Sequence, residues 1–282
     1  MKFRTEVNID KPTFSIRPLE RMLFVGSCFA DNIGRRFLED KFRAVVNPYG
    51  VMYNPVSVLH TVKRFIEDSR QSSDVGASPF DGSERWVCVF TLGTNHVYRL
   101  KETGEIVDNC RKRPQRLFQE EELTIDQCCE ALSEAVGILE KINPEVKVIV
   151  TVSPIRYAKY GFHGSQLSKA TLLLAADKLC REHDNCTYFP AYEIVNDELR
   201  DYRFYKEDML HPSEQAVSYI WERFSELYFS KETSSFLEKW RPIKEALGHK
   251  PFNPDAEEYK LFMLRTMERI KELQRLYPEL DV

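Results

Sequence analysis

Met22-Leu23-Phe24-Val25-Gly26-Ser27-Cys28-Phe29-Ala30 is the stretch that decides how this chain folds. Its four leading apolar residues are typical of a buried strand, and Gly26-Ser27 is typical of a sharp turn. A helical pattern follows over 31–38, so Ser27 is expected where a strand meets a helix. The carboxyl ends of strands bind ligands in open α/β sheets, and a helix start stabilises anions. Ser27 is therefore either a helix cap, the commoner role for such a serine, or a nucleophile.

A second motif, far downstream, favours the nucleophile. Asp208 and His211 lie in Asp208-Met209-Leu210-His211-Pro212-Ser213, just before a helical pattern over 214–228. At this spacing the carboxylate can bind one imidazole nitrogen and leave the other to take a proton from a serine. Alone, the pair also fits an exposed histidine at a helix start. Placed after the last strand of a sheet whose first strand ends in Gly-Ser, it predicts a triad with Ser27.

The remaining pattern predicts an α/β fold. Strand and helix signals alternate, and the resulting order implies right-handed crossovers and a three-layer α/β/α sandwich with a mostly parallel central sheet. The expected strands are 22–25, 44–46, 86–92, 146–152 and 187–189, with a grafted hairpin of 96–100 and 105–107. The expected helices are 55–67, 124–142, 165–182 and 214–228, and 69–83 is expected to be a surface loop.

These residues together resemble the GSCFA family, a branch of the SGNH (GDSL-like) hydrolases. In that superfamily an early strand ends in Gly-Asp-Ser, and a late Asp-x-x-His supplies the base. The resemblance implies an SGNH (flavodoxin-like) sheet with Ser27 as nucleophile, His211 as base and Asp208 as its partner. Gly26 stands where the superfamily usually has Asp. The similarity extends from about residue 17 to about 229 and includes 47–51, 92–94, 108–112 and 167–171.

The resemblance also implies three donors for an oxyanion hole. The backbone amide of Ser27 is the first, and Gly50 best matches the glycine that supplies the second. Asn95, in Gly93-Thr94-Asn95, matches the side chain that supplies the third, with Asn109 as its competitor. Both asparagines flank the expected hairpin strands, so a turn role is the alternative for each.

Two further residues lie near the predicted site. Cys28 follows Ser27, and a thiol at a helix start could act as an alternative nucleophile. It is more simply a core residue, because cysteine is commonly buried. Arg156 follows the strand at 146–152, so it is expected at the same sheet edge. It would bind a polar or anionic part of a substrate, or form a salt bridge within the loop.

Composition excludes several function classes. The net charge of −4 argues against a nucleic-acid binder, and 43% hydrophobic with 30% charged residues is ordinary for a globular enzyme. No signal peptide or membrane span is expected, and the seven cysteines show no disulfide-like spacing. We therefore expect reduced thiols and a cytoplasmic location. Nucleotide and metal motifs are lacking, so no cofactor and no metal are expected.

The chain is expected to divide into a catalytic domain (1–230) and a helical C-terminal extension (231–282). The extension has two helical segments, 233–246 and 256–276, and Pro242 is expected to kink or split the first. The second carries an apolar stripe formed by Tyr259, Phe262, Met263, Met267, Ile270 and Leu273. Such a stripe packs on its own domain or forms a homodimer. In either case the extension is expected to contribute nothing to the catalytic residues.

The predicted function is a cofactor-independent serine hydrolase that cleaves an ester through an acyl-enzyme intermediate. By resemblance, the substrate is a small-molecule or carbohydrate ester, and the group removed is a small acyl group such as acetyl. Two alternatives remain open. One is a non-catalytic glycan-binding or scaffolding protein on the same fold, and the other is an acyltransferase that uses the same triad.

Overall fold

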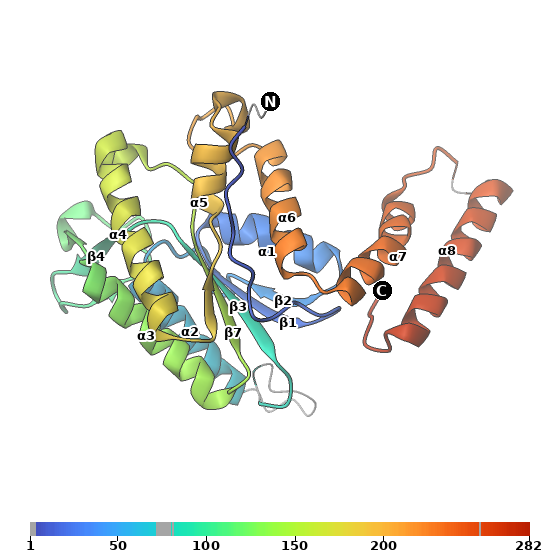
Figure 1. Cartoon of the computed structure of the whole chain (residues 1–282), viewed down its shortest axis with the longest axis horizontal. Helices are drawn as coiled ribbons and strands as arrows, with labels where there is room; N and C mark the ends of the chain where they lie inside the picture. Colours follow the sequence, from blue (N-terminus) through green and yellow to red (C-terminus); the bar gives the residue numbers. More distant parts are fainter. Residues whose placement is uncertain (1–3, 72–79, 81, 254) are drawn as a thin grey trace.

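A five-stranded parallel sheet forms the centre of the protein (Figure 1). The computed structural model describes residues 4–71, 80, 82–253 and 255–282. The strand order is β2-β1-β3-β7-β8, and every pairing is parallel. The bounds are β1 Arg21–Gly26, β2 Arg43–Val46, β3 Trp86–Leu92, β7 Lys147–Val152 and β8 Cys186–Tyr188. The predicted mostly parallel sheet is confirmed.

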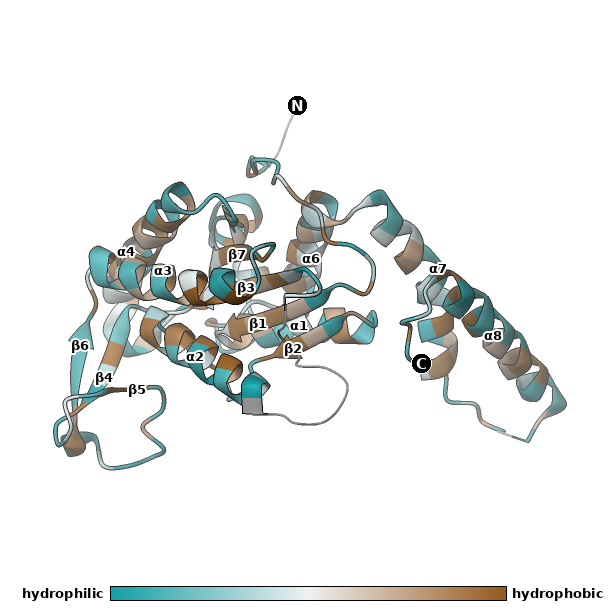
Figure 2. Cartoon of the chain, turned by 90° about the horizontal axis from the view of Figure 1, so that it is seen from below, coloured by the Kyte–Doolittle hydropathy of each residue, from teal (hydrophilic) through white to brown (hydrophobic). Residues whose placement is uncertain are grey.

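Helices cover both faces of this sheet (Figures 1 and 2). Leu23 and Val25 of β1 face one helical layer, and Met22 and Phe24 face the other, because side chains alternate along a strand. The first layer contains α2 Pro55–Gln71, α3 Ile125–Ile142 and α4 Gly161–Glu182. The second contains α1 Cys28–Glu39, α5 Ala191–Glu193, a π-helical turn Ile194–Leu199 and α6 Glu214–Tyr228. The predicted three-layer sandwich is confirmed.

A small antiparallel sheet follows β3 and has the order β5-β4-β6. Its strands are β4 His96–Leu100, β5 Ile106–Val107 and β6 Phe118–Glu122. The sequence predicted the β4–β5 hairpin but missed β6, whose three consecutive glutamates disfavour a strand. Cations offset this charge, since Arg99 pairs with Glu121 and Lys159 with Glu120.

The C-terminal residues form a helical hairpin of α7 Lys231–Gly248 and α8 Glu257–Leu276 at one end of the molecule (Figure 1). Helix α7 continues through Pro242 and is not split. The indole N–H of Trp240 donates to the carbonyl of Glu39, the last residue of α1. The hairpin therefore packs against the end of α1 that is distant from Ser27.

The predicted stripe on α8 is covered only in part. Ile270 and Leu273 are buried with residues of α7, whereas Phe262 and Met267 are 40% and 49% exposed. Packing on the rest of the chain thus buries two of the six residues of the stripe. Homodimerisation and the division at residue 230 stay predictions.

Shorter elements complete the chain. The 3₁₀ turns are Gln115–Leu117, Ala158–Tyr160 and Tyr202–Phe204. The helix predicted over 55–67 extends to Gln71, and most of the loop predicted over 69–83 lies outside the described residues. No helix in the described ranges is long and apolar enough to cross a membrane.

Candidate active site

Ser27 lies between β1 and α1 and caps the helix. Its Oγ accepts a hydrogen bond from the backbone N–H of Phe29 at 3.3 Å and lies 3.1 Å from Oγ1 of Thr91. The residue is buried, with 1% of its surface exposed. The capping role considered for this serine is therefore real, and it leaves the hydroxyl at the carboxyl edge of the parallel sheet.

Gly26 allows this turn to form because no other residue fits its position. Its φ of +143° is one that L side chains rarely adopt. A Cβ built on Gly26 would stand 2.2 Å from the carbonyl oxygen of Thr91 on the neighbouring strand. The aspartate that the superfamily usually has at this position could not be accommodated here without moving β1 or β3.

Asn47 supports the same turn from the loop after β2. Its Oδ1 accepts a hydrogen bond from the backbone N–H of Gly26 at 2.9 Å, and its Nδ2 donates to Asp31 of α1 at 2.6 Å. Asn47 adopts a φ of +40°, which asparagine tolerates better than most residues. Sequence reasoning missed this role. Residues 47–51 belong to the segments that carry the family resemblance, but no local pattern shows a bond to a residue 21 positions away.

Asp208 and His211 form a hydrogen-bonded pair on the loop that enters α6. His211 Nδ1 lies 2.6 Å from Asp208 Oδ2, while Asp208 Oδ1 accepts the backbone N–H groups of Leu210 and His211 at 2.8 and 3.0 Å. The two backbone N–H groups and the imidazole lower the pKa of Asp208 to about 2. Asp208 is thus ionised at neutral pH and accepts a hydrogen bond from the Nδ1–H group of His211. The other ring nitrogen, Nε2, is then the one that can accept a proton.

Arg156 holds this loop in place. Its backbone N–H donates to the carbonyl of Leu210, and its guanidinium donates to the carbonyl of Met209, both at 3.0 Å. The guanidinium also stacks over the rings of Phe162 and Tyr205, at 4.1 and 5.5 Å from their centroids. Met209 has a φ of +56°, so the loop has a turn that non-glycine residues rarely adopt. Arg156 lies where the sequence predicted, and a substrate-binding role for it stays a prediction.

Ser27 and His211 belong to the same edge of the sheet. Gly26 of β1, Thr91 of β3 and Thr151 of β7 are register partners, and Arg156 follows β7 closely enough to bond the loop of His211. The two side chains form no hydrogen bond with each other in the described part of the chain, and Ser27 Oγ lies 3.1 Å from Thr91 Oγ1 instead. The predicted approach of about 3 Å stays a prediction.

Three of the four predicted oxyanion donors have other partners here. The amide of Ser27 donates to Thr91 O at 3.0 Å, and that of Gly50 donates to Asn47 O at 2.9 Å. The Nδ2 group of Asn95 donates to the carbonyl of Leu123 at 2.8 Å, and its Oδ1 is buried without a partner among the described residues. Asn109 is exposed, and its Oδ1 accepts the amide of Arg111, as in an Asx turn. Their oxyanion roles stay predictions.

Cys28 is half-buried at the start of α1 rather than fully buried as expected. Burial, the largest effect, raises the pKa of its thiol, and the neighbouring carboxylate of Asp31 raises it further. A thiol held in its protonated form is a poor nucleophile. The environment of Cys28 therefore favours the serine beside it.

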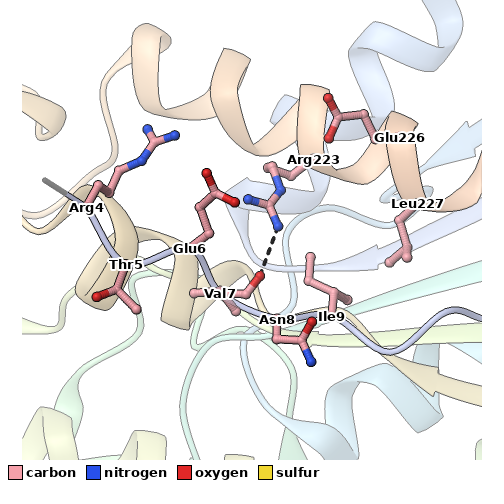
Figure 3. Close-up of a pocket in the computed structure, with 9 residues that line it drawn as sticks. All are labelled: Arg4, Thr5, Glu6, Val7, Asn8, Ile9, Arg223, Glu226 and Leu227. Carbon is pink, nitrogen blue, oxygen red and sulfur yellow. Dashed lines mark hydrogen bonds between the residues drawn. The ribbon is translucent and has the colours of Figure 1, made fainter. Parts of the chain in front are cut away.

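Several cavities lie around the domain. One of about 260 Å³ adjoins the loop of His211 and is lined by Arg156, Gln166, Val195, Asn196, Arg200, Asp201, Tyr202 and Tyr205. Another, of about 700 Å³, lies where residues 4–9 cross α6, and there Arg223 donates to the carbonyl of Val7 (Figure 3). Among the described residues, no group of three His, Cys, Asp or Glu side chains is arranged to hold a metal ion.

Comparison with known protein families shows to which family the chain belongs. The GSCFA family model matches residues 21–86 and 77–224, a range that contains Ser27, Asp208 and His211. The chain belongs to the GSCFA family. A second model, of the C-terminal domain of GSCFA domain proteins, matches residues 240–282 of this GSCFA protein. No match was found among curated proteins.

Solved structures similar to this GSCFA protein include several esterases. A candidate GDSL-like lipase from Parabacteroides merdae is 15% identical, with a TM-score of 0.47 over 77% of this chain and 100% of the other. The acetylxylan esterase Axe2 from Geobacillus stearothermophilus is 12% identical, with a TM-score of 0.45 over 77% and 98%. A carbohydrate esterase family 3 protein from Talaromyces cellulolyticus is 9% identical, with a TM-score of 0.41 over 78% and 98%.

Proposed function

We propose that this GSCFA protein is a serine esterase with Ser27 as nucleophile, His211 as general base and Asp208 as the residue that orients His211. The observation that carries the proposal is the 2.6 Å bond between His211 Nδ1 and Asp208, on a loop bonded to the sheet edge where Ser27 lies. An ionised carboxylate bound to Nδ1 sets the tautomer in which Nε2 accepts a proton. The N-terminus of α1, which begins at Cys28, adds a positive field that stabilises the negative charge of the tetrahedral intermediate.

In this mechanism, Ser27 Oγ attacks the carbonyl carbon of the ester while His211 Nε2 takes the hydroxyl proton. The tetrahedral intermediate collapses, the bond to the alcohol oxygen breaks, and His211 returns the proton to the leaving alcohol. Water then attacks the acyl-enzyme with His211 again as base, which releases the acid and restores Ser27. The mechanism requires the Ser27 hydroxyl proton to point toward His211, and a rotation of Oγ gives up its hydrogen bonds with Thr91 and with the Phe29 N–H.

The substrate we propose is a carbohydrate ester that carries a small acyl group such as acetyl. The 260 Å³ cavity beside the loop supports a compact polar alcohol, because Tyr202, Tyr205 and Arg156 offer aromatic faces and hydrogen-bond donors. The substrate class otherwise rests on superfamily analogy. In this proposal residues 1–230 contain the whole catalytic site and residues 231–282 form a separate helical extension.

Hydrolysis of p-nitrophenyl acetate tests the proposal. Ser27→Ala and His211→Ala should each remove nearly all turnover, because members of a triad act as a unit. Cys28→Ser is the matched control, since it changes the adjacent residue by one atom and should keep most of the activity. An essential Cys28 together with a dispensable Ser27 would replace the proposed mechanism by a thiol mechanism.

A further inference from the structure

Lys169 of α4 is a buried cation at the edge of the central sheet. Only 2% of its surface is exposed, and its Nζ donates to the carbonyls of Gly93 and Ser153, both at 2.7 Å. These carbonyls come directly after β3 and β7. An ammonium has three hydrogens, and the third has no oxygen or nitrogen acceptor among the described residues, although the centroid of the Tyr157 ring lies 5.5 Å from Nζ. No carboxylate in the described part of the chain pairs with it.

The ammonium lies close to the proposed nucleophile. Gly26 and Thr91 are register partners, so Ser27 and Gly93 are at nearly the same height on neighbouring strands. Neighbouring strands are about 4.8 Å apart, and Gly93 directly follows the strand next to the one that leads into Ser27. Burial raises the pKa of the thiol of Cys28, the residue next to Ser27, and the charge of Lys169 offsets part of this rise.

Keeping a buried cation without a carboxylate partner is costly. Burial lowers the pKa of Lys169 to about 7. A leucine or methionine would fill the same space without this penalty, so the charge itself calls for an explanation. Among the donors predicted for the oxyanion hole, the amides of Ser27 and Gly50 meanwhile have other partners, and the Asn95 side chain uses one of its two N–H groups on Leu123.

We propose that the third N–H of the Lys169 ammonium stabilises the negative oxygen of the tetrahedral intermediate formed at Ser27. Lys169 would thus take the place that the superfamily gives to an asparagine side chain. This inference rests on the proposed esterase function. A full charge in a site shielded from water stabilises an oxyanion more than a neutral amide does. No proton leaves Lys169 in this step, since the ammonium only donates a hydrogen bond.

Lys169→Met tests the inference, since methionine keeps the apolar stem and removes the charge. We expect kcat for p-nitrophenyl acetate to fall by about 10²–10³ while KM stays unchanged, as for loss of an oxyanion donor. Lys178→Met, on the exposed side of the same helix, is the matched control and should keep full activity. A Lys169→Met protein with full kcat would overturn the inference.

The pH profile of kcat distinguishes an oxyanion donor from a general base and from a purely structural residue. Below pH 7 Lys169 carries its proton, and above pH 7 it loses it, so wild-type kcat should fall on the alkaline side. This fall should be absent from the residual activity of Lys169→Met. A rise through the same range that is present in the wild type and lost in Lys169→Met would assign Lys169 as a general base, and the same profile in both proteins would make it a structural support. Either result overturns the inference.

A measurement on the wild-type protein covers the case in which the variant does not fold. Phenylboronic acid forms an anionic tetrahedral adduct on a serine nucleophile, and the titration of Lys169 can be followed by NMR of [13C]ε-lysine. The pKa of Lys169 should rise by about one unit or more in the adduct, because an opposite charge stands beside it. An unchanged pKa would overturn the inference. Absence of Ser27-dependent turnover in the wild type would instead reject the proposed function itself.

Discussion

Replacing Gly26 by alanine tests how the nucleophile turn is built. The new Cβ would meet Thr91 O at 2.2 Å and would also hold a φ of +143°. Backbone strain of this kind costs about 1–3 kcal/mol and overpacking another 1–3, so we expect the free energy of unfolding to fall by about 2–6 kcal/mol. Urea unfolding followed by fluorescence of the three tryptophans measures the loss.

Two other glycines separate the cost of backbone strain from the cost of overpacking. Gly50 has a φ of +93° but open space around its missing Cβ, so Gly50→Ala should show strain alone, about 1–3 kcal/mol. Gly137 is inside α3 with open space and an ordinary helical φ, so Gly137→Ala should stabilise by about 0.4–1 kcal/mol. If Gly26→Ala costs no more than Gly50→Ala, the close approach of β3 to this turn is not a constraint, and the reasoning is refuted.

Three further substitutions test the surroundings of the site. Asn47→Ala should lower the free energy of unfolding by about 1–3 kcal/mol, because the Gly26 amide and Asp31 both lose a partner, and an unchanged urea midpoint would contradict this. Arg156→Ala should lower kcat in steady-state ester hydrolysis and leave KM unchanged if Arg156 positions the loop, whereas a raised KM with constant kcat would make it a substrate ligand. Trp240→Ala should lower the free energy of unfolding in urea by about 3–5 kcal/mol. The fraction of folded molecules whose Ser27 reacts with a fluorophosphonate probe should stay unchanged, and a reduced fraction would show that the C-terminal hairpin contributes to the site.

The layers of the fold were predictable because their signals are local. Each central strand is a nearly uninterrupted apolar run bounded by Gly, Pro or polar residues, as in Trp86–Leu92. Strand β6 could not be predicted, since its glutamates become tolerable only beside Arg99 and Lys159, which approach from other elements. The π-helical turn at Ile194–Leu199 has no sequence pattern that distinguishes it from an ordinary helix.

The proposed site was predictable to different degrees. The Asp208–His211 bond follows from a spacing of three residues and was found in the sequence. The roles of Thr91, Asn47 and Lys169 were missed, although 47–51 and 167–171 carry part of the family resemblance, because their contacts join residues distant in the sequence and depend on strand register. Lys169 lies in a helical segment, where a lysine usually points to solvent, and only burial in the fold distinguishes it.

Identification of the residue that reacts with a fluorophosphonate probe tests the central claim most directly. Mass spectrometry of the digested, labelled protein locates the adduct. We predict a single adduct on Ser27, absent in Ser27→Ala and strongly reduced in His211→Ala, because the probe reports a serine activated by its base. A folded wild-type protein that takes up no probe at Ser27, or whose labelling persists in His211→Ala, would contradict the assignment of this sheet edge as a serine esterase site.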